Sequence, residues 1–243
     1  MFIYEGKAKR LYKTELGYVM EFKDEVTAGD GARRDKAPGK GVLAAGTSAL
    51  LFSHIESGGV ATHFIKTWGP NSLLVKPAEP KPLEVIVRFK AYGSYLKRMP
   101  RLEPLTPFRR PIVEFHLKDD RLHDPLLLEE DVIEGGLATE GEVKDMRSMA
   151  TAAAAMLKEL YARANCDLLD IKLEFGTAGG SLVLIDEISG DTFRLICGGE
   201  HLDKEYYRKT GDARGLVERY RQLLEITKNV TQFRLPQPSR GVW

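Results

Sequence analysis

The run over 168–176 alternates apolar and charged residues, and this alternation constrains the fold more than any other feature of the sequence. Successive side chains of a strand point to opposite faces. Three charged residues, Asp170, Lys172 and Glu174, would therefore share one face, while the apolar residues between them would enter a core. A glycine-rich turn and a second apolar run over 182–185 follow. The sequence therefore predicts a β-hairpin with one charged face.

This hairpin would return Asp186 or Glu187 to the neighbourhood of Lys172 and Glu174. Such a group of carboxylates and an ammonium suits Mg²⁺ and nucleotide phosphates, because Mg²⁺ takes carboxylate oxygens and keeps phosphate and water in its other positions. A solvated sheet face with ion pairs is the alternative, since antiparallel sheets often expose one face. The hairpin alone leaves both interpretations open.

The rest of the chain predicts an α+β protein in two parts. Residues 1–80 are β-rich and contain one helix over 40–57, with its apolar residues on one side. A proline-containing stretch over 76–82 is the expected boundary, because proline stiffens the chain and removes hydrogen-bond donors. Residues 81–230 combine the hairpin with a helix that starts at the capping box over 139–142. A tail over 231–243 has no periodicity.

Composition excludes several classes of protein. The chain has 36 Lys and Arg against 35 Asp and Glu, which gives no general attraction to nucleic acid or to a membrane surface. No apolar run approaches the ~20 residues that span a bilayer, and the first residues lack the pattern of a signal peptide. Cys166 and Cys197 form no metal-type cluster. We expect both to be reduced thiols in a cytoplasmic protein.

Two turns carry groups that suit phosphate or a ligand amine. Gly6-Lys7-Ala8-Lys9 is a small-residue turn whose backbone and ammonium groups can approach phosphates closely, although the Walker pattern is absent. An exposed basic hairpin is the alternative. Asp30 stands between two glycines and can present its carboxylate to a ligand, with an ordinary Asp-Gly turn as the alternative.

Two arginines suit phosphate or carboxylate groups. Arg88 ends an apolar strand shortly before Gly93 and Ser94, and Arg194 follows the hairpin. A guanidinium binds phosphate or carboxylate bidentately. Either arginine is therefore a plausible clamp for such a group.

Taken together and in order, these segments resemble the family of phosphoribosylaminoimidazole-succinocarboxamide (SAICAR) synthetases. The resemblance covers about residues 2–228, and its most specific part is the Asp-x-Lys-Leu-Glu-Phe-Gly run. The matching segments are Tyr4-Glu5-Gly6-Lys7-Ala8-Lys9, Ala28-Gly29-Asp30-Gly31-Ala32, Gly39-Lys40-Gly41, Pro82-Leu83-Glu84-Val85 with Arg88 and Gly93-Ser94, Ile112-Val113-Glu114-Phe115 with Lys118 and His123-Asp124-Pro125, Asp170–Gly176, and Asp186-Glu187-Ile188-Ser189 with Arg194.

The resemblance implies a two-lobed α+β fold, with a β-rich N-terminal lobe, an α/β C-terminal lobe and ATP in the cleft between them. It implies a ligase that uses ATP and Mg²⁺ to join L-aspartate to the carboxylate of carboxyaminoimidazole ribonucleotide. The reaction passes through an acyl phosphate and gives SAICAR, ADP and phosphate in purine biosynthesis. The resemblance also implies a homodimer.

The resemblance assigns roles to individual residues. ATP would be bound by Gly6, Lys7, Ala8, Lys9, Val75, Lys76 and Lys118. Mg²⁺ would be bound by Glu174 and Asp186. The phosphate and carboxylate of the imidazole nucleotide would be bound by Arg88, Gly93, Ser94 and Arg194. The residues expected to act in catalysis are Asp30, Lys172 and Arg194.

Three departures from the family pattern fall at substrate-side positions. Ala44-Ala45-Gly46 stands where the family has Asn-Asn-Lys, Phe89 and Tyr92 replace smaller or polar residues, and Ile196-Cys197 replaces Trp-Asp. A substrate that needed the lost polar partners would be penalised, since each unpaired buried polar group costs about 1–3 kcal/mol. Two alternatives therefore stay open. One is a paralogue that activates a related nucleotide carboxylate for a nucleoside natural product, and the other is a catalytically silent nucleotide-binding protein.

Overall fold

The structure is a computed structural model that describes residues 1–29 and 31–232. Helices and strands are mixed along the chain, and the predicted α+β class is confirmed. Among the described residues, no helix is both long enough and apolar enough to cross a membrane. The tail was predicted to begin at residue 231, but Thr231 and Gln232 belong to the last helix, and the tail from 233 onward lies outside the described residues.

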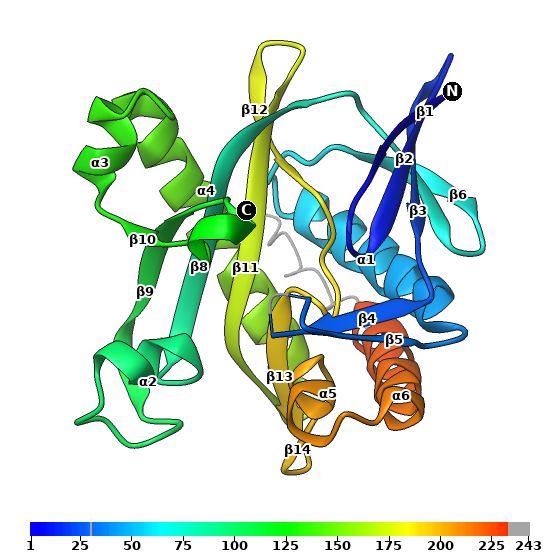
Figure 1. Cartoon of the computed structure of the whole chain (residues 1–243), viewed down its shortest axis with the longest axis vertical. Helices are drawn as coiled ribbons and strands as arrows, with labels where there is room; N and C mark the ends of the chain where they lie inside the picture. Colours follow the sequence, from blue (N-terminus) through cyan, green and yellow to red (C-terminus); the bar gives the residue numbers. More distant parts are fainter. Residues whose placement is uncertain (30, 233–243) are drawn as a thin grey trace, which may run out of the picture.

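A five-stranded antiparallel sheet occupies the N-terminal part of the chain, at the upper right of Figure 1. Helix α1 (Lys40–Ser57) packs against β3, β6 and β7 of this sheet, and its bounds are those predicted from the sequence. A separate hairpin, β4 (Glu25–Ala28) and β5 (Arg33–Lys36), lies below this sheet in the view of Figure 1. In sheet order the five strands are β1 (Phe2–Glu5), β2 (Lys9–Thr14), β3 (Gly17–Phe22), β7 (Ser72–Val75) and β6 (Phe64–Gly69).

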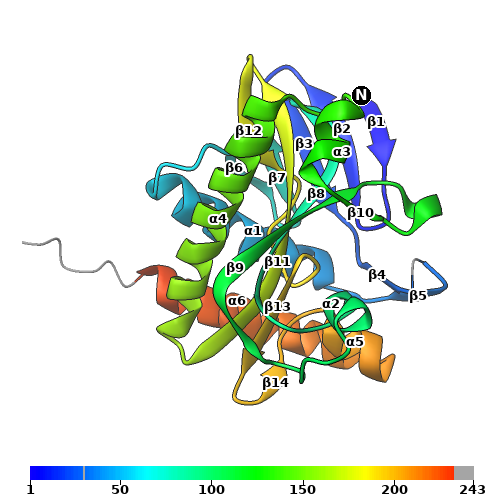
Figure 2. The same ribbon diagram turned by 90° about the vertical axis from the view of Figure 1, so that its left-hand side faces the viewer.

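A seven-stranded sheet forms the centre of the molecule. Its path runs β10 (Leu126–Leu127), β9 (Pro107–Leu117), β8 (Glu79–Lys90), β11 (Cys166–Ala178), β13 (Phe193–Cys197) and β14 (Glu200–His201), and β12 (Ser181–Ile185) pairs with the far end of β11. Helix α4 (Glu140–Ala162) lies along one face of this sheet, and the β4–β5 hairpin lies on the other side (Figures 1 and 2). The remaining helices are α2 (Ser94–Arg98), α3 (Glu129–Glu134), α5 (Glu205–Thr210) and α6 (Ala213–Gln232).

The predicted hairpin is confirmed as β11 and β12, with Glu174 opposite Ile185. Its apolar residues are buried, and its charged residues face away from them. The capping box at the start of α4 is also confirmed, because the Thr139 hydroxyl accepts from the Glu142 N–H at 3.2 Å and Glu142 accepts from the Thr139 N–H at 2.9 Å.

The chain passes from one sheet to the other between β7 and β8, and β8 begins at Glu79 within the predicted boundary. Pro80 and Pro82 are accommodated there, since pairing of β8 with β9 begins only at Leu83. A single hydrophobic core includes residues from both sides of this crossing, such as Phe52 and Phe175. The division into two lobes at residue 80 stays a prediction.

The expectation that both cysteines are reduced thiols is wrong. Cys166 and Cys197 form a disulfide with an S–S distance of 1.99 Å. The two residues stand opposite each other where β11 pairs with β13. They are 31 residues apart in sequence, so their spacing gives no sign of the pairing, which depends on strand register. The disulfide also removes one of the arguments for a cytoplasmic protein.

Candidate active site

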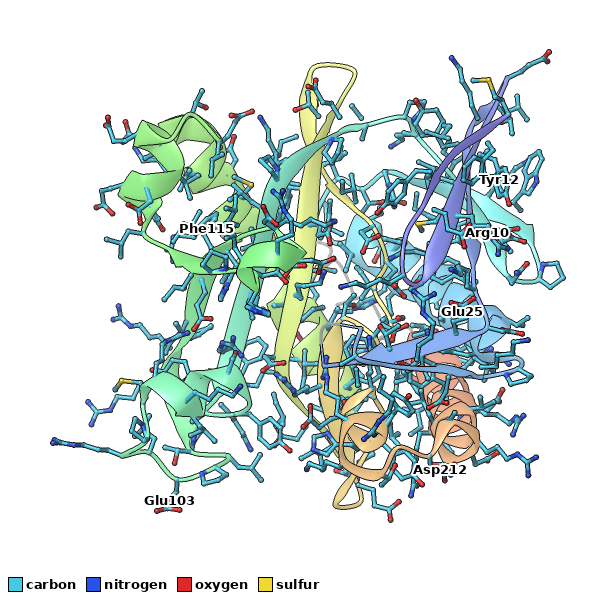
Figure 3. All side chains as sticks on the ribbon, viewed as in Figure 1. Arg10, Tyr12, Glu25, Glu103, Phe115 and Asp212 are labelled. Carbon is cyan, nitrogen blue, oxygen red and sulfur yellow. A yellow bond between two sulfur atoms is a disulfide. The ribbon has the colours of Figure 1, made fainter. Side chains whose placement is uncertain are left out.

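A cleft of about 460 Å³ lies between the β1–β2 turn, the β4–β5 hairpin and the charged face of β8 and β11. Glu25 of β4, labelled in Figure 3, is one of the residues that line this cleft. Most of the predicted site residues line this cleft: Gly6, Lys7, Ala8, Lys9, Arg88, Ser94, Lys118, Lys172, Asp186 and Arg194. The fold therefore brings together residues that are far apart in sequence.

A second cavity of about 210 Å³ adjoins the cleft and has mainly apolar walls. Three further predicted residues, Val75, Lys76 and Glu174, line this cavity and not the cleft. The two cavities share lining residues, which are Tyr4, Lys9, Lys118 and Asp186. An elongated ligand with an apolar end and an anionic end could occupy both.

Lys9 lies between two carboxylates at the boundary of these cavities. Its Nζ is 2.6 Å from Asp186 Oδ1 and 2.7 Å from Glu187 Oε1. Burial lowers the pKa of Lys9, but the two carboxylates outweigh burial and raise the pKa overall. Asp186 follows β12 in a left-handed conformation with φ of 67°, which is uncommon outside glycine and frequent at functional sites. The two carboxylates thus hold Lys9 in its charged form.

Lys172 forms a second charged group on the sheet. Its Nζ is 2.6 Å from Glu84 Oε1 and 2.8 Å from Glu174 Oε1, and Lys118 bonds the other oxygen of Glu174. Glu84 and Glu174 stand opposite each other on β8 and β11, so the register brings them to one ammonium. Burial lowers the pKa of Lys172, yet Glu174 and Glu84 raise it well above its ordinary value.

Arg88 and Arg194 share one carboxylate. Arg88 Nη1 is 3.1 Å and Arg194 Nη1 is 2.7 Å from Asp170 Oδ2. Arg88 is only 1% exposed and also donates to Glu114 at 2.8 Å and to the Ser94 hydroxyl at 3.1 Å. Most of its donors are therefore engaged within the protein, whereas Arg194 is the more accessible arginine.

Two predicted residues are placed differently from the rest. Gly93 lines neither cavity. It has a φ of 57°, and a Cβ on it would lie 2.6 Å from Arg194 Nη2. Gly93 is thus required for the close approach of its backbone to the guanidinium. Asp30 lies outside the described residues, and its role stays a prediction.

The predicted magnesium ligands, Glu174 and Asp186, pair with lysines in this structure. Within residues 1–29 and 31–232, no three His, Cys, Asp or Glu side chains gather as a metal site. Two carboxylates nevertheless fit Mg²⁺, because this ion is commonly held by one or two carboxylates and completed by water and substrate phosphates.

The first departure from the family pattern lies in packing, away from the cleft. Ala44 and Ala45 are buried in α1. A Cβ on Gly46 would lie 3.3 Å from a Leu224 methyl group, so the small residue lets α1 approach α6. None of these three residues lines either cavity.

The other departures have separate roles. Phe89 packs under Lys158, whose Nζ is 4.5 Å from the ring centroid, and Cys197 forms the disulfide. Tyr92 contacts a residue of the cleft, because the Arg194 guanidinium carbon lies 5.4 Å from its ring centroid.

Sequence reasoning missed several charged residues of the site. Glu84 joins the lysine group, and its alternation with apolar residues in β8 was an available signal. Asp170 was expected on the charged face, but its pairing with Arg88 and Arg194 was not foreseen. Lys204 and Arg208 also line the cleft, at the start of α5 and within it. They are four residues apart and belong to no motif.

Comparison with known proteins gives one consistent result. A sequence model of the SAICAR synthetase family matches residues 2–224. Phosphoribosylaminoimidazole-succinocarboxamide synthase of Pyrobaculum calidifontis is 69% identical over 226 residues, which is 93% of this chain and 94% of that protein.

Solved structures agree with the sequence comparison. The crystal structure of phosphoribosylaminoimidazole-succinocarboxamide synthase from Ehrlichia chaffeensis superposes with a TM-score of 0.89 and 34% identity, covering 94% of this chain and 98% of that one. A SAICAR synthetase in complex with ADP superposes with a TM-score of 0.88 and 37% identity, covering 93% and 97%.

Proposed function

The chain belongs to the SAICAR synthetase family, and we propose that it joins L-aspartate to carboxyaminoimidazole ribonucleotide at the expense of ATP. The products would be SAICAR, ADP and phosphate. The observation that carries the proposal is one cleft of about 460 Å³ in which lysines, carboxylates and arginines of the family motifs meet beside an apolar cavity.

We place ATP across the two cavities. The apolar cavity with Val75 and Lys76 would accept the adenine, and the phosphates would lie toward the turn over 6–9 and Lys118. The shared lining residues support this placement, since they connect the two spaces. The ADP complex of a 37% identical family member also supports a nucleotide in this fold.

The chemistry explains the residue types in the cleft. A carboxylate resists attack by an amine, so its oxygen first attacks the γ-phosphorus of ATP, and the bond to ADP breaks. The aspartate amine then attacks the carbon of the acyl phosphate, and phosphate leaves as the nitrogen loses a proton. Catalysis of this kind rests on positioning and on neutralising charge. Lys9, Lys118 and Lys172 supply fixed positive charge for both steps.

Carboxylates and arginines would complete the site. Glu174 and Asp186 would hold Mg²⁺, whose charge neutralises the phosphates when it is bound. Arg194, with Ser94 and Arg88 behind it, would bind the phosphate of the imidazole nucleotide. Asp30 and Lys172 would orient its amino and carboxylate groups.

The test is ADP release with ATP, Mg²⁺, carboxyaminoimidazole ribonucleotide and L-aspartate, with mass analysis of the product. We expect SAICAR at a typical enzyme rate of ~1–10³ s⁻¹. ADP release only with another carboxylated nucleotide would instead identify a paralogue. Binding of ATP without turnover of any carboxylate would identify a silent nucleotide-binding protein.

A further inference from the structure

The guanidinium group of Arg194 is contacted along two of its edges and on one of its faces. Its Nη1 and Nε donate to Asp170 at 2.7 Å and to Glu205 at 3.2 Å. Its guanidinium carbon lies 5.4 Å from the centre of the Tyr92 ring, and the Gly93 backbone stands against Nη2. These contacts fix the plane of the guanidinium, and Nη2 enters no ion pair among the described residues.

Tyr92 is itself anchored at its hydroxyl. Lys209 Nζ donates to that oxygen at 2.6 Å, and His201 Nε2 lies 2.9 Å from it. His201 Nδ1 is 2.9 Å from Asp203 Oδ2. The Tyr92 hydroxyl thus joins Lys209 to the pair formed by His201 and Asp203.

Asp203 connects this chain of contacts to the elements that carry Arg194. It is fully buried and accepts from the backbone N–H groups of Leu195 at 2.8 Å and of Glu205 at 2.7 Å. Leu195 follows Arg194 in β13, and Glu205 is the second carboxylate partner of Arg194. Tyr92 is thereby tied to both the backbone and the side-chain support of the arginine.

We propose that Tyr92 is a positioning residue for Arg194, and that its ring and hydroxyl fix the guanidinium in the orientation that binds the phosphate of the nucleotide substrate. The inference rests on the proposed function in assigning that phosphate to Arg194. Tyr92 immediately precedes Gly93 and Ser94, so it also ties the Ser94 connection to β13 and α5. Tyr92, which stands where the family pattern has a smaller residue, therefore links Arg194 and Ser94 to β13 and α5.

The experiment measures binding and turnover in the same full-length variants. Calorimetric titration uses 5-aminoimidazole ribonucleotide, which keeps the ribose phosphate and lacks the reacting carboxylate, so it measures binding at Arg194 with no reaction. Titration with ADP and Mg²⁺ measures binding at the proposed ATP site. We expect Tyr92→Leu to weaken the imidazole nucleotide about 5- to 30-fold, within the range of a cation–π contact, and to change ADP binding less than twofold.

Two further variants calibrate the result. Tyr92→Phe keeps the ring but removes the hydroxyl that bonds Lys209 and His201, and it should weaken the imidazole nucleotide about 2- to 10-fold with ADP binding unchanged. This selective loss tests the proposal if the leucine variant does not fold, and a parental affinity would remove the hydroxyl from the positioning role. Arg194→Ala removes the guanidinium itself, so its loss of affinity for the imidazole nucleotide is the largest that we expect from any of these variants. In turnover assays, Tyr92→Leu should raise KM for the imidazole nucleotide and leave KM for ATP unchanged.

Tyr206→Leu is the matched control. Tyr206 lies on helix α5, which also carries Glu205 and Lys209, and its ring centre is 5.2 Å from the Arg219 guanidinium carbon. Its hydroxyl donates to Asp212 at 3.0 Å. It has the same chemistry as Tyr92 and lines neither cavity. Binding of both ligands should be unchanged.

The outcomes separate the two proposals. If the parent protein makes SAICAR but Tyr92→Leu weakens both ligands equally, weakens neither, or is matched by Tyr206→Leu, the role of Tyr92 is overturned and the proposed function stands. If the parent binds the imidazole nucleotide without turnover and Tyr92→Leu weakens that ligand selectively, the proposed function fails and the role of Tyr92 stands. If the parent binds no imidazole nucleotide, both fail.

Discussion

Each of three lysines in the cleft is matched to carboxylates at bonding distance. Lys9 lies between Asp186 and Glu187, Lys172 lies between Glu84 and Glu174, and Lys118 also bonds Glu174. Anionic ligands must therefore exchange partners with these carboxylates rather than meet bare cations. The acidic residues are consequently as important to the site as the lysines.

Replacing either predicted magnesium ligand should stop turnover without unfolding the protein. We expect Glu174→Gln and Asp186→Asn each to lower kcat at least ~10²-fold, the loss typical of removing one group that stabilises transition-state charge. The measurement is ADP release as a function of Mg²⁺ concentration, with circular dichroism as the check on folding.

Glu140→Gln is the control for this prediction. Glu140 pairs with Lys144 at 2.7 Å on the surface of α4, far in sequence from the site, and should keep the parental rate. Near-parental rates in either site variant would remove that residue from the metal site.

The sequence indicated many of these residues but not their partners. Alternation within one strand put Lys172 and Glu174 on a common face, and that inference needs only the pleat of a strand. The contact of Lys172 with Glu84 depends on how β11 pairs with β8. Register between strands that are distant in sequence has no local signature, so Glu84 was missed.

At the scale of elements, the same limit explains the disulfide. Strand β13 pairs with the short edge strand β14. The disulfide between Cys197 and Cys166 joins β13 to β11 at the end of β13 that is distant from Arg194. Helix α1, by contrast, was predicted to its bounds because its periodicity and the following glycines are local signals. Local elements were therefore predictable, and pairings between them were not.

Removing the disulfide should destabilise the protein. Closure of a loop across the 31-residue separation contributes roughly 3–4 kcal/mol in the chain-entropy treatment, and for a chain of this size ~1 kcal/mol shifts Tm by about 2–4 °C. We expect the double variant Cys166→Ala, Cys197→Ala to unfold about 6–16 °C lower. Calorimetry in the absence of reductant makes the measurement.

Reduced parent protein serves as the comparison for the double variant. Thiol titration in denaturant should find no free thiol before reduction and both cysteines after it. Free thiols in the untreated protein, or equal Tm values with and without reductant, would contradict the stabilising role.

At the scale of the whole molecule, stability should fall in mild acid because of a buried histidine. Burial lowers the pKa of His63 to about 4, despite the Asp186 carboxylate and backbone carbonyl that favour its charged form. The ordinary value is 6.5. The unfolded chain therefore binds more protons between these values, so this contribution is complete above pH ~6.5 and is lost as the pH falls toward 4.

The expected loss from His63 is about 2 kcal/mol between pH 7 and pH 5. Urea unfolding at several pH values measures it. His63→Gln should flatten this part of the profile, although its stability at pH 7 can differ from that of the parent. An unchanged slope in the variant would assign the acid sensitivity to other groups.

The floor and the rim of the cleft differ in how firmly the backbone beneath them is held. Arg88, Asp170 and Lys172 stand on β8 and β11, strands whose backbones are paired on both sides in the middle of the sheet. Tyr92 and Ser94 stand on or beside a connection. A substitution at the rim can therefore alter the contacts offered to a ligand without disturbing the paired strands beneath it. Tyr92 stands at this rim, beside Arg194.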